Sequence, residues 1–270
     1  MTQDFHGKVA LITGAGGGMG QAVCRRLLEL GWTVFGLDRQ APGSAEKLCF
    51  IPTDLTDAAS VEEACARVRQ QTEHLDAIVH LAGVYDLDSL VEMDEQAITR
   101  LFQVNLFGVY RVNRAFFPLL SKGSRIVITS SELAPLDPLP FTGIYGVSKA
   151  ALEKYADSLR MEVNLHGISV SVIRPGAVKT GLLDVSTRAL DRFCAETKYY
   201  PCNAERFRRI VNSVEAKHVP PERIAGRVEK ALTAKCPKYT YNVNRNPLLR
   251  LLNLLPKRLQ VSIIRGILKN

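Results

Sequence analysis

Short runs of apolar and β-branched residues alternate with longer amphipathic segments along the chain, and this alternation constrains the fold more than any other feature. Seven short runs are predicted strands, at residues 8–13, 33–38, 48–53, 76–81, 125–130, 169–174 and 238–243. Four segments with helical periodicity lie between them, at 20–31, 57–72, 95–120 and 146–167. Near-continuous apolar strands are typical of a parallel sheet covered on both faces. The pattern therefore predicts an α/β fold with a doubly wound parallel sheet of about seven strands.

The chain is expected to form a single domain over residues 1–243. Residues 178–213 interrupt the alternation and are interpreted as an insertion, here called the lid, over the carboxyl edge of the sheet. Residues 244–270 form a separate C-terminal tail with six Lys or Arg and no acidic residue. The rest of the chain then holds 29 basic residues against 27 acidic ones and is nearly neutral. Nucleic-acid binding usually needs a basic face on the folded domain, so it is not expected here.

Targeting and metal-binding patterns are not found in the sequence. The N-terminus has no basic region followed by an apolar stretch and a cleavage site, and no run approaches the roughly 18–20 apolar residues of a membrane span. The six cysteines are scattered without a C-x-x-C, and the five histidines show no metal spacing. A cytoplasmic protein without a metal is expected.

A glycine-rich turn, TGAGGGMG at residues 13–20, follows the first predicted strand and opens the first predicted helix. Glycine lets the backbone approach a pyrophosphate, which the helix N-terminus then stabilises. The spacing is T-G-x-x-x-G-x-G, with Gly14, Gly18 and Gly20 in place and Met19 where G-x-G-x-x-G would need glycine. No Walker A lysine follows, which excludes a P-loop. The turn predicts a dinucleotide-binding site.

At this point the chain resembles the short-chain dehydrogenase/reductase family in its single-domain form, over about residues 7–243. The resemblance rests on motifs in order: the glycine turn, Asp54, HLAG at 80–83, Asn105 in VNLFG, serines before Tyr145-x-x-x-Lys149, and RPG at 174–176 followed by Thr180. It implies a Rossmann-type fold, a nicotinamide cofactor and the chemistry of hydroxysteroid- or retinol-type dehydrogenases. It also implies a homodimer or homotetramer assembled through the helices at 95–120 and 145–166.

Tyr145 and Lys149 are predicted to form an acid–base pair. A phenol has a pKa of about 10, too high for a base at neutral pH. A lysine four residues later lies on the same helix face, and its positive charge favours the phenolate. Tyr145 can then take the alcohol proton while a hydride leaves the carbinol carbon, and return it in reduction. By the resemblance, Asn105 anchors a water that relays protons to Lys149.

The catalytic serine is placed by its distance from Tyr145. In the family it most often precedes the tyrosine by 13 positions, which falls here on Glu132. Pro140 keeps its usual distance from Tyr145, so one extra residue lies between 131 and 140. This insertion favours Ser131, with Ser130 as the alternative. Glu132 is disfavoured because a second negative charge would oppose the phenolate.

The cofactor is predicted to be NAD. A carboxylate at Asp38 accepts hydrogen bonds from both ribose hydroxyls and repels a 2′-phosphate, although the adjacent Arg39 could partly accommodate NADP. His80 stands where the family usually has Asn and is assigned a structural role only. By the resemblance, further cofactor contacts are expected at Gly14, Gly18, Met19, Gly20, Asp54, Leu55, Ala82, Gly83, Tyr145, Lys149, Pro175, Gly176 and Thr180.

These features predict an NAD(H)-dependent oxidoreductase that interconverts a secondary alcohol and a ketone. A mostly apolar lid favours a small lipophilic substrate such as a steroid, retinoid or other lipid. Its apolar residues are Leu182, Leu183, Val185, Phe193, Tyr199 and Tyr200. Two alternatives remain: a reductase of 3-oxoacyl chains bound to a carrier protein, and a dinucleotide-sensing protein without turnover. The intact Tyr, Lys, Asn and Ser set argues against the sensor, which needs none of them.

The tail is predicted to form two short helical segments divided by Pro256. In the second segment one stripe is apolar and another side is basic. This stripe fits two roles equally well: docking on the domain or a neighbouring subunit, or peripheral contact with a membrane surface. The apolar stripe comprises Leu259, Ile263, Ile264, Ile267 and Leu268.

Overall fold

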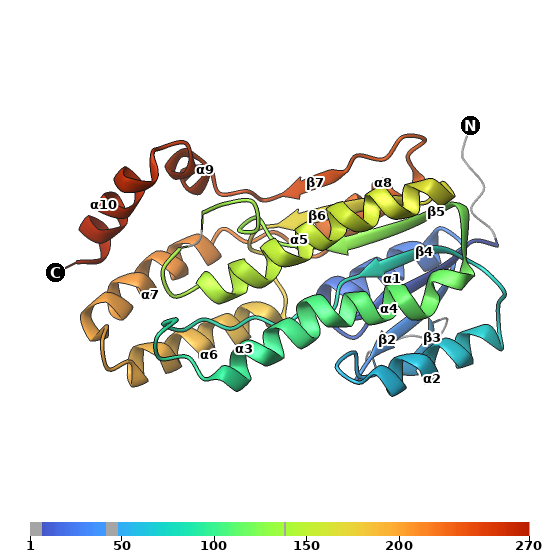
Figure 1. The fold of residues 1–270 in the computed structure, drawn as a ribbon, viewed down its shortest axis with the longest axis horizontal. Helices are drawn as coiled ribbons and strands as arrows, with labels where there is room; N and C mark the ends of the chain where they lie inside the picture. Colours follow the sequence, from blue (N-terminus) through green and yellow to red (C-terminus); the bar gives the residue numbers. More distant parts are fainter. Residues whose placement is uncertain (1–6, 42–47, 138, 270) are drawn as a thin grey trace.

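The computed structural model describes residues 7–41, 48–137 and 139–269. Within them seven parallel strands form one sheet in the order β3-β2-β1-β4-β5-β6-β7 (Figure 1). The strands are β1 (Val9–Thr13), β2 (Thr33–Asp38), β3 (Leu48–Pro52), β4 (Leu75–His80), β5 (Leu120–Thr129), β6 (Ser169–Pro175) and β7 (Thr240–Val243). The doubly wound parallel sheet predicted from the sequence is confirmed.

Helices cover both faces of the sheet and extend past its carboxyl edge (Figure 1). They are α1 (Gly18–Glu29), α2 (Ala58–Arg69), α3 (Glu95–Phe102), α4 (Gly108–Phe116), α5 (Gly143–Val163), α6 (Gly181–Glu196), α7 (Pro201–Glu215), α8 (Glu222–Thr233), α9 (Pro247–Asn253) and α10 (Lys257–Leu268). Shorter turns are the π-helical η1 (Gln103–Phe107) and the 3₁₀ turns η2 (Phe117–Leu119) and η3 (Asn164–His166).

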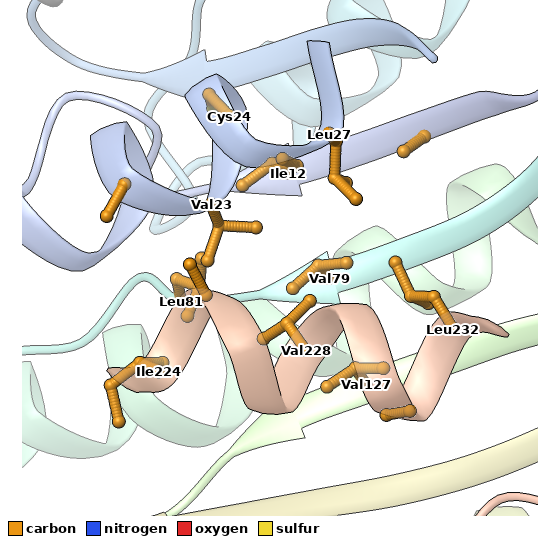
Figure 2. Close-up of a cluster of buried hydrophobic side chains, with 14 of the residues drawn as sticks. Ile12, Val23, Cys24, Leu27, Val79, Leu81, Val127, Ile224, Val228 and Leu232 are labelled. Atoms are coloured by element: carbon orange, nitrogen blue, oxygen red, sulfur yellow. The ribbon is translucent and has the colours of Figure 1, made fainter. Parts of the chain in front are cut away.

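Side chains that alternate along each strand form the two halves of the core. On β1, Ile12 lies in the cluster that α1 and α8 cover, whereas Leu11 lies in the cluster covered by α2 and α4. Figure 2 shows the first of these clusters, in which Val228 of α8 packs over strand residues such as Val79 and Val127. The central strands are covered on both faces and are therefore largely apolar, as in the fully buried β1, and this made them recognisable in the sequence.

The direction in which successive strands are added to the sheet reverses between β1 and β4. From β1 the chain winds outward through β2 to β3, then returns to place β4 on the other side of β1. Such a switch point opens a crevice at the carboxyl ends of the strands, where open α/β sheets bind their ligands.

Two parts of the predicted helix pattern are wrong. The single helix expected over 95–120 is divided into α3, η1 and α4, and it ends earlier because β5 already begins at Leu120. The helix α8 was not predicted, although Ile224, Val228 and Leu232 recur at helical spacing on its buried face. In η1 the backbone leaves the α-helical register where a side chain, Asn105, makes bonds to a neighbouring loop, a device common at functional sites.

The lid consists of α6 and α7, which lie at the carboxyl end of the sheet (Figure 1). Beneath them Phe141 packs against the rings of Phe193, Tyr200 and Phe207 at centroid distances of 4.6, 5.3 and 5.3 Å. Phe141 has a φ of 65°, in the left-handed region. Burial among three rings offsets a backbone conformation that costs roughly 1–2 kcal/mol for a residue with a Cβ.

The tail forms α9 and α10, and α10 docks beside α7 (Figure 1). Leu268 is buried in the cluster beneath the lid and Ile264 packs against it. The docked end is fastened by polar contacts, since Asn203 Nδ2 donates to the Leu268 carbonyl at 2.6 Å. Within the described residues, none of the helices combines the length and the apolar content that crossing a bilayer demands.

Candidate active site

The glycine turn packs so closely that side chains are excluded at two positions. Gly14 has a φ of 73°, and a Cβ there would lie 2.5 Å from the amide nitrogen of Ala82. A Cβ on Gly20 would lie 2.0 Å from the carbonyl oxygen of Gly14. In the described part of the chain no side chain caps the first turn of α1. A bare backbone cradle with free helical N–H groups fits the pyrophosphate of a dinucleotide.

The predicted cofactor residues of the later strands lie around this turn. A Cβ on Gly18 would be 3.0 Å from Cγ2 of Thr180, so Thr180 stands against the turn. Its hydroxyl also accepts a hydrogen bond from the Leu182 amide at 3.3 Å and so caps α6. Pro175 and Gly176 line the adjoining cavity, as do Gly83 and Met19.

Asp38 closes β2 beside the same turn. Its Oδ2 accepts a hydrogen bond from the Gly16 amide at 2.9 Å, and its Oδ1 accepts one from the Arg39 amide at 2.7 Å. Carboxylate oxygens have further lone pairs, so both remain able to accept from a ribose. The Arg39 side chain is exposed.

Asp54 and Leu55 are held by local contacts at the end of β3. Asp54 Oδ1 accepts hydrogen bonds from the hydroxyl of Thr56 at 2.7 Å and from its amide at 2.8 Å, which together lower the pKa of this carboxyl. The Leu55 side chain is buried and would meet a Cβ on Gly108 at 3.1 Å. The Leu55 carbonyl accepts a hydrogen bond from Arg111 Nη1 at 3.1 Å.

Tyr145 and Lys149 lie on the buried face of α5. Burial raises the pKa of Tyr145 to about 12 because it disfavours the phenolate, and hydrogen bonding with Ser131 acts in the opposite direction. Burial also lowers the pKa of Lys149 to about 8, against the attraction of Glu153. Lys149 Nζ donates to the Thr129 carbonyl at 3.1 Å and lies 5.9 Å from the centroid of the Tyr145 ring. The ammonium group thus lies beside the Tyr145 ring.

The two candidate serines point in different directions. Ser131 Oγ accepts a hydrogen bond from the Leu133 amide at 3.2 Å and interacts with the Tyr145 hydroxyl. Ser130 Oγ instead lies 3.5 Å from the backbone carbonyl of Lys149, within the packing of α5 on β5. Of the two hydroxyls, only that of Ser131 acts on the phenol.

Asn105 is fully buried in η1 and joins three segments. Its Oδ1 accepts from the Val84 amide at 2.9 Å, while its Nδ2 donates to the Val84 carbonyl at 3.0 Å and to Ser148 Oγ at 3.2 Å. A Cβ on Gly83 would stand 3.4 Å from both Asn105 Oδ1 and Lys149 Nζ. Asn105 and Lys149 thus flank one glycine.

His80 supports this region from β4. Its Nε2 pairs with Asn113 Oδ1 at 2.8 Å, and its Nδ1 has no hydrogen-bond partner among the described residues. Burial lowers the pKa of His80 to about 4, since a second ring proton would have no acceptor.

A cavity of about 220 Å³ extends from Tyr145 and Ser131 to the lid. Its lid wall is mainly apolar and is formed by Leu182, Leu183, Phe207, Ile210, Val211 and Val214. Two of the six apolar lid residues predicted from the sequence, Leu182 and Leu183, line it. The other four do not line it. Phe193 and Tyr200 pack beneath the lid, Tyr199 between α6 and α7 is 70% exposed, and Val185 is only partly buried and lies outside the cavity lining.

The polar side chains in this cavity that were not predicted as site residues include Tyr85, Glu132, Ser186 and Glu215. Glu132 Oε2 accepts the Asn246 amide at 2.6 Å, and burial raises its pKa. The other three come from a loop and both lid helices. No motif or spacing distinguishes Tyr85, Ser186 and Glu215, so sequence reasoning alone had no signal for these three. Glu132 was considered only as the position of the catalytic serine and was disfavoured because of its charge.

Comparisons with known proteins agree with this geometry. The family model described as short chain dehydrogenase matches residues 8–190. A 3-ketodihydrosphingosine reductase of Bacteroides thetaiotaomicron is 26% identical over 246 residues, covering 91% of this chain and 90% of that protein. The human 17-beta-hydroxysteroid dehydrogenase type 2 is 29% identical over 257 residues, or 85% of this chain, which spans only 65% of that relative's length. A short chain dehydrogenase of Burkholderia cenocepacia, solved in complex with NADP, superposes with a TM-score of 0.73 at 20% identity, covering 99% and 100% of the two chains.

Proposed function

The chain belongs to the short-chain dehydrogenase/reductase family of NAD(P)-dependent oxidoreductases acting on CH–OH and keto groups, and we propose that it uses NAD(H) to interconvert a secondary alcohol and a ketone on a lipophilic substrate. The observation that carries this proposal is the convergence of Tyr145, Ser131 and Lys149 at one end of an apolar cavity, beside the bare glycine cradle.

Proton transfer is assigned to Tyr145. Bound NAD(H) supplies the hydride acceptor or donor. In oxidation the Tyr145 phenolate takes the substrate's hydroxyl proton, and in reduction the phenol returns it. Ser131 orients the substrate oxygen toward Tyr145, and its hydrogen bond opposes the rise that burial causes in the pKa of the phenol. The Lys149 ammonium, 5.9 Å from the centroid of the Tyr145 ring, is proposed to favour the phenolate by its charge. Asn105 holds the loop at Gly83 and, through it, the neighbourhood of Lys149.

The preference for NAD over NADP is supported by Asp38. Its half-buried carboxylate stands at the end of β2 next to the glycine turn, and a 2′-phosphate placed there would meet a like charge. Among the described contacts, Arg39 is bonded to the Asp38 carboxylate by its backbone amide and not by its guanidinium, and Arg39 is exposed.

A lipophilic substrate is supported by the lid wall and by the names of the relatives. The cavity is walled by Leu, Ile, Val and Phe, and such a pocket retains apolar ligands by burying their surface. One relative is named for 3-ketodihydrosphingosine and another for a 17-beta-hydroxysteroid. We assign this chain to the same broad class, a ketone or alcohol on a lipid- or steroid-like skeleton.

Assembly is proposed to use α4 and α5, which expose apolar side chains on the surface. Tyr110 on α4 is 44% exposed, and Val147 and Met161 on α5 are 41% and 76% exposed. Phe107 in η1, which leads into α4, is 44% exposed. An apolar helical face of this kind is buried when a second copy packs against it, as expected for a homodimer or homotetramer.

Peripheral membrane contact is proposed through α9 rather than through the stripe of α10. Ile264 and Leu268 of that stripe are used in docking on the lid cluster. On and just after α9, however, Leu248, Leu251 and Leu254 are 71%, 61% and 82% exposed, and the tail carries no acidic residue to repel anionic headgroups. Exposed leucines flanked by cations suit the interface of an anionic bilayer.

The proposed function is tested by screening lipophilic alcohols and ketones with NAD(H) and NADP(H), following the absorbance of the reduced cofactor. Tyr145→Phe removes only the phenolic hydroxyl and should lower kcat by about 10²–10⁴-fold while NADH binding is retained. Tyr239→Phe, the same exchange at a side chain that is 70% exposed and outside the cavity lining, is the matched control. Unchanged turnover in Tyr145→Phe would refute the assignment of the acid–base group.

A further inference from the structure

A carboxylate, Glu215, stands in the apolar wall of the cavity and has no role in the proton transfer derived above. It is the last residue of α7 and shares the cavity lining with Ile210, Val211 and Val214 of the same helix. Its Oε1 accepts a hydrogen bond from Ser186 of α6 at 2.6 Å. Burial raises the pKa of Glu215, so its surroundings disfavour the charge it carries.

The position of Glu215 is unfavourable for an isolated negative charge. The C-terminus of a helix bears partial negative charge, which repels a carboxylate at that end. In the described part of the chain Glu215 takes part in no ion pair, whereas nearby acids such as Asp86 are paired, in that case with Arg192 at 2.7 Å. His218 contacts the backbone carbonyl of Glu215 and not its carboxylate. A half-buried charge that the protein itself leaves without a cation is suited to receive one from a ligand.

Glu215 is linked to the proposed reaction centre by two intervening side chains. The Tyr85 ring lies edge-on to the Tyr145 ring at a centroid distance of 4.7 Å. The Tyr85 hydroxyl is hydrogen-bonded to Ser186, which in turn donates to Glu215. Tyr85 also lines the cavity, and an aromatic ring attracts a cation near its face. The carboxylate and the ring thus favour the same kind of substrate group.

We propose that Glu215, Ser186 and Tyr85 form a subsite for a protonated amine, so that the substrate of this enzyme is a lipophilic ketone or alcohol that carries an ammonium group. This inference rests on the proposed function for the reaction at the ketone or alcohol. The binding of the amine does not depend on that reaction. The ammonium group donates to the free oxygen of Glu215, while Ser186 keeps the other oxygen fixed. The apolar skeleton lies along Ile210, Val211 and Val214.

Glu132 is the other carboxylate in the cavity and provides the comparison. It already accepts the Asn246 amide and lies under the influence of the Arg245 guanidinium, which lowers its pKa against the larger effect of burial. Because Glu132 has these partners, it does not need a ligand cation. The amine preference should therefore depend on Glu215 and not on Glu132.

The test compares decylamine with 1-decanol as ligands of the cofactor-loaded protein by isothermal titration calorimetry. Both probes present the same alkyl chain, and only the amine is charged. A hydrogen bond between charged groups predicts that the parent protein binds the amine about 10–100-fold more tightly. Glu215→Gln, which keeps the shape and can still bond Ser186, should abolish that ratio, and Glu132→Gln should retain it.

The inference is overturned by any of three results: equal binding of both probes, an amine preference that survives in Glu215→Gln, or one that disappears in Glu132→Gln instead. A preference for decanol that depends on Glu215 would also overturn it and would indicate a hydroxyl subsite. Repeating the titration in Tyr145→Phe separates the two proposals. The amine preference should persist there without turnover, so loss of the proposed function and loss of the subsite give different results.

Discussion

Acidification should destabilise this protein through His80 in particular. The imidazole is buried, donates from Nε2 to Asn113 and has no acceptor for a second proton on Nδ1 among the described residues. The unfolded chain exposes this histidine, whose pKa then returns to 6.5 from about 4 in the folded state. Between these two values the unfolded state binds more protons, so the free energy of unfolding falls as the pH falls.

The size of this effect follows from the shift in pKa. One pKa unit corresponds to about 1.4 kcal/mol, so the stability contributed by neutral His80 is complete above pH 6.5 and is lost by about 2 kcal/mol at pH 5 and about 3 kcal/mol at pH 4. A typical domain has only about 5–15 kcal/mol of stability in total, so the loss is readily measurable. Carboxylates also titrate in this range, so their contribution to the free energy of unfolding must be separated from that of His80.

The experiment is a double difference between the parent protein and His80→Asn. Urea unfolding, followed by the fluorescence of the single buried tryptophan, Trp32, gives the free energy of unfolding at pH 7.5 and pH 5. The carboxylates are common to both proteins, so the parent should lose about 2 kcal/mol more than the variant. His166→Asn, at an exposed ring, controls for the exchange of residue type. If the parent protein and His80→Asn lose the same free energy of unfolding between pH 7.5 and pH 5, the argument from the burial of His80 is wrong.

Three further predictions concern the serine, the cofactor and the tail. Ser131→Ala should reduce kcat by about 10²–10³-fold while Ser130→Ala is milder, and the reverse order in steady-state kinetics would contradict the assignment. NAD should exceed NADP in kcat/KM, and Asp38→Ala should reduce that preference by about 10–100-fold; equal efficiency in the parent protein would contradict the role of Asp38. Replacing the two exposed leucines at 251 and 254 with serine should reduce co-sedimentation with anionic vesicles, whereas Leu165→Ser should not; equal pelleting of both variants would refute membrane contact through α9.

The periodic apolar pattern was sufficient to predict the sheet, because strands buried on both faces must be apolar along their length. The glycine turn was predictable for a similar reason, since Gly14 and Gly20 occupy positions where no Cβ fits. Pattern was insufficient for the helix expected over 95–120. Asn105 is hydrogen-bonded to Val84, which is distant from it in the sequence. The π-helical turn that contains Asn105 therefore has no periodic signature in the sequence.

The choice between the two serines shows where sequence reasoning ends. Counting residues favoured Ser131, but adjacent side chains on an extended segment point in opposite directions, and only the tertiary contacts show that Ser130 lies against α5 while Ser131 lies at Tyr145. The role of the C-terminal tail also depended on tertiary contacts. Its apolar stripe fitted docking and membrane contact equally well, and the packing of Leu268 beneath the lid shows that part of it docks on the protein.

By itself, the sequence determined the α/β class, the dinucleotide cradle and the helical pair of Tyr145 and Lys149, because each depends on residue types at fixed local spacing. Only the tertiary structure decided what surrounds them. Burial, which shifts the pKa of Tyr145 and Lys149 in opposite directions, is a property of the packed molecule. The hydrogen bonds that connect Tyr85 to Glu215 through Ser186 likewise join residues far apart in the chain, and no local pattern encodes contacts that exist only after folding.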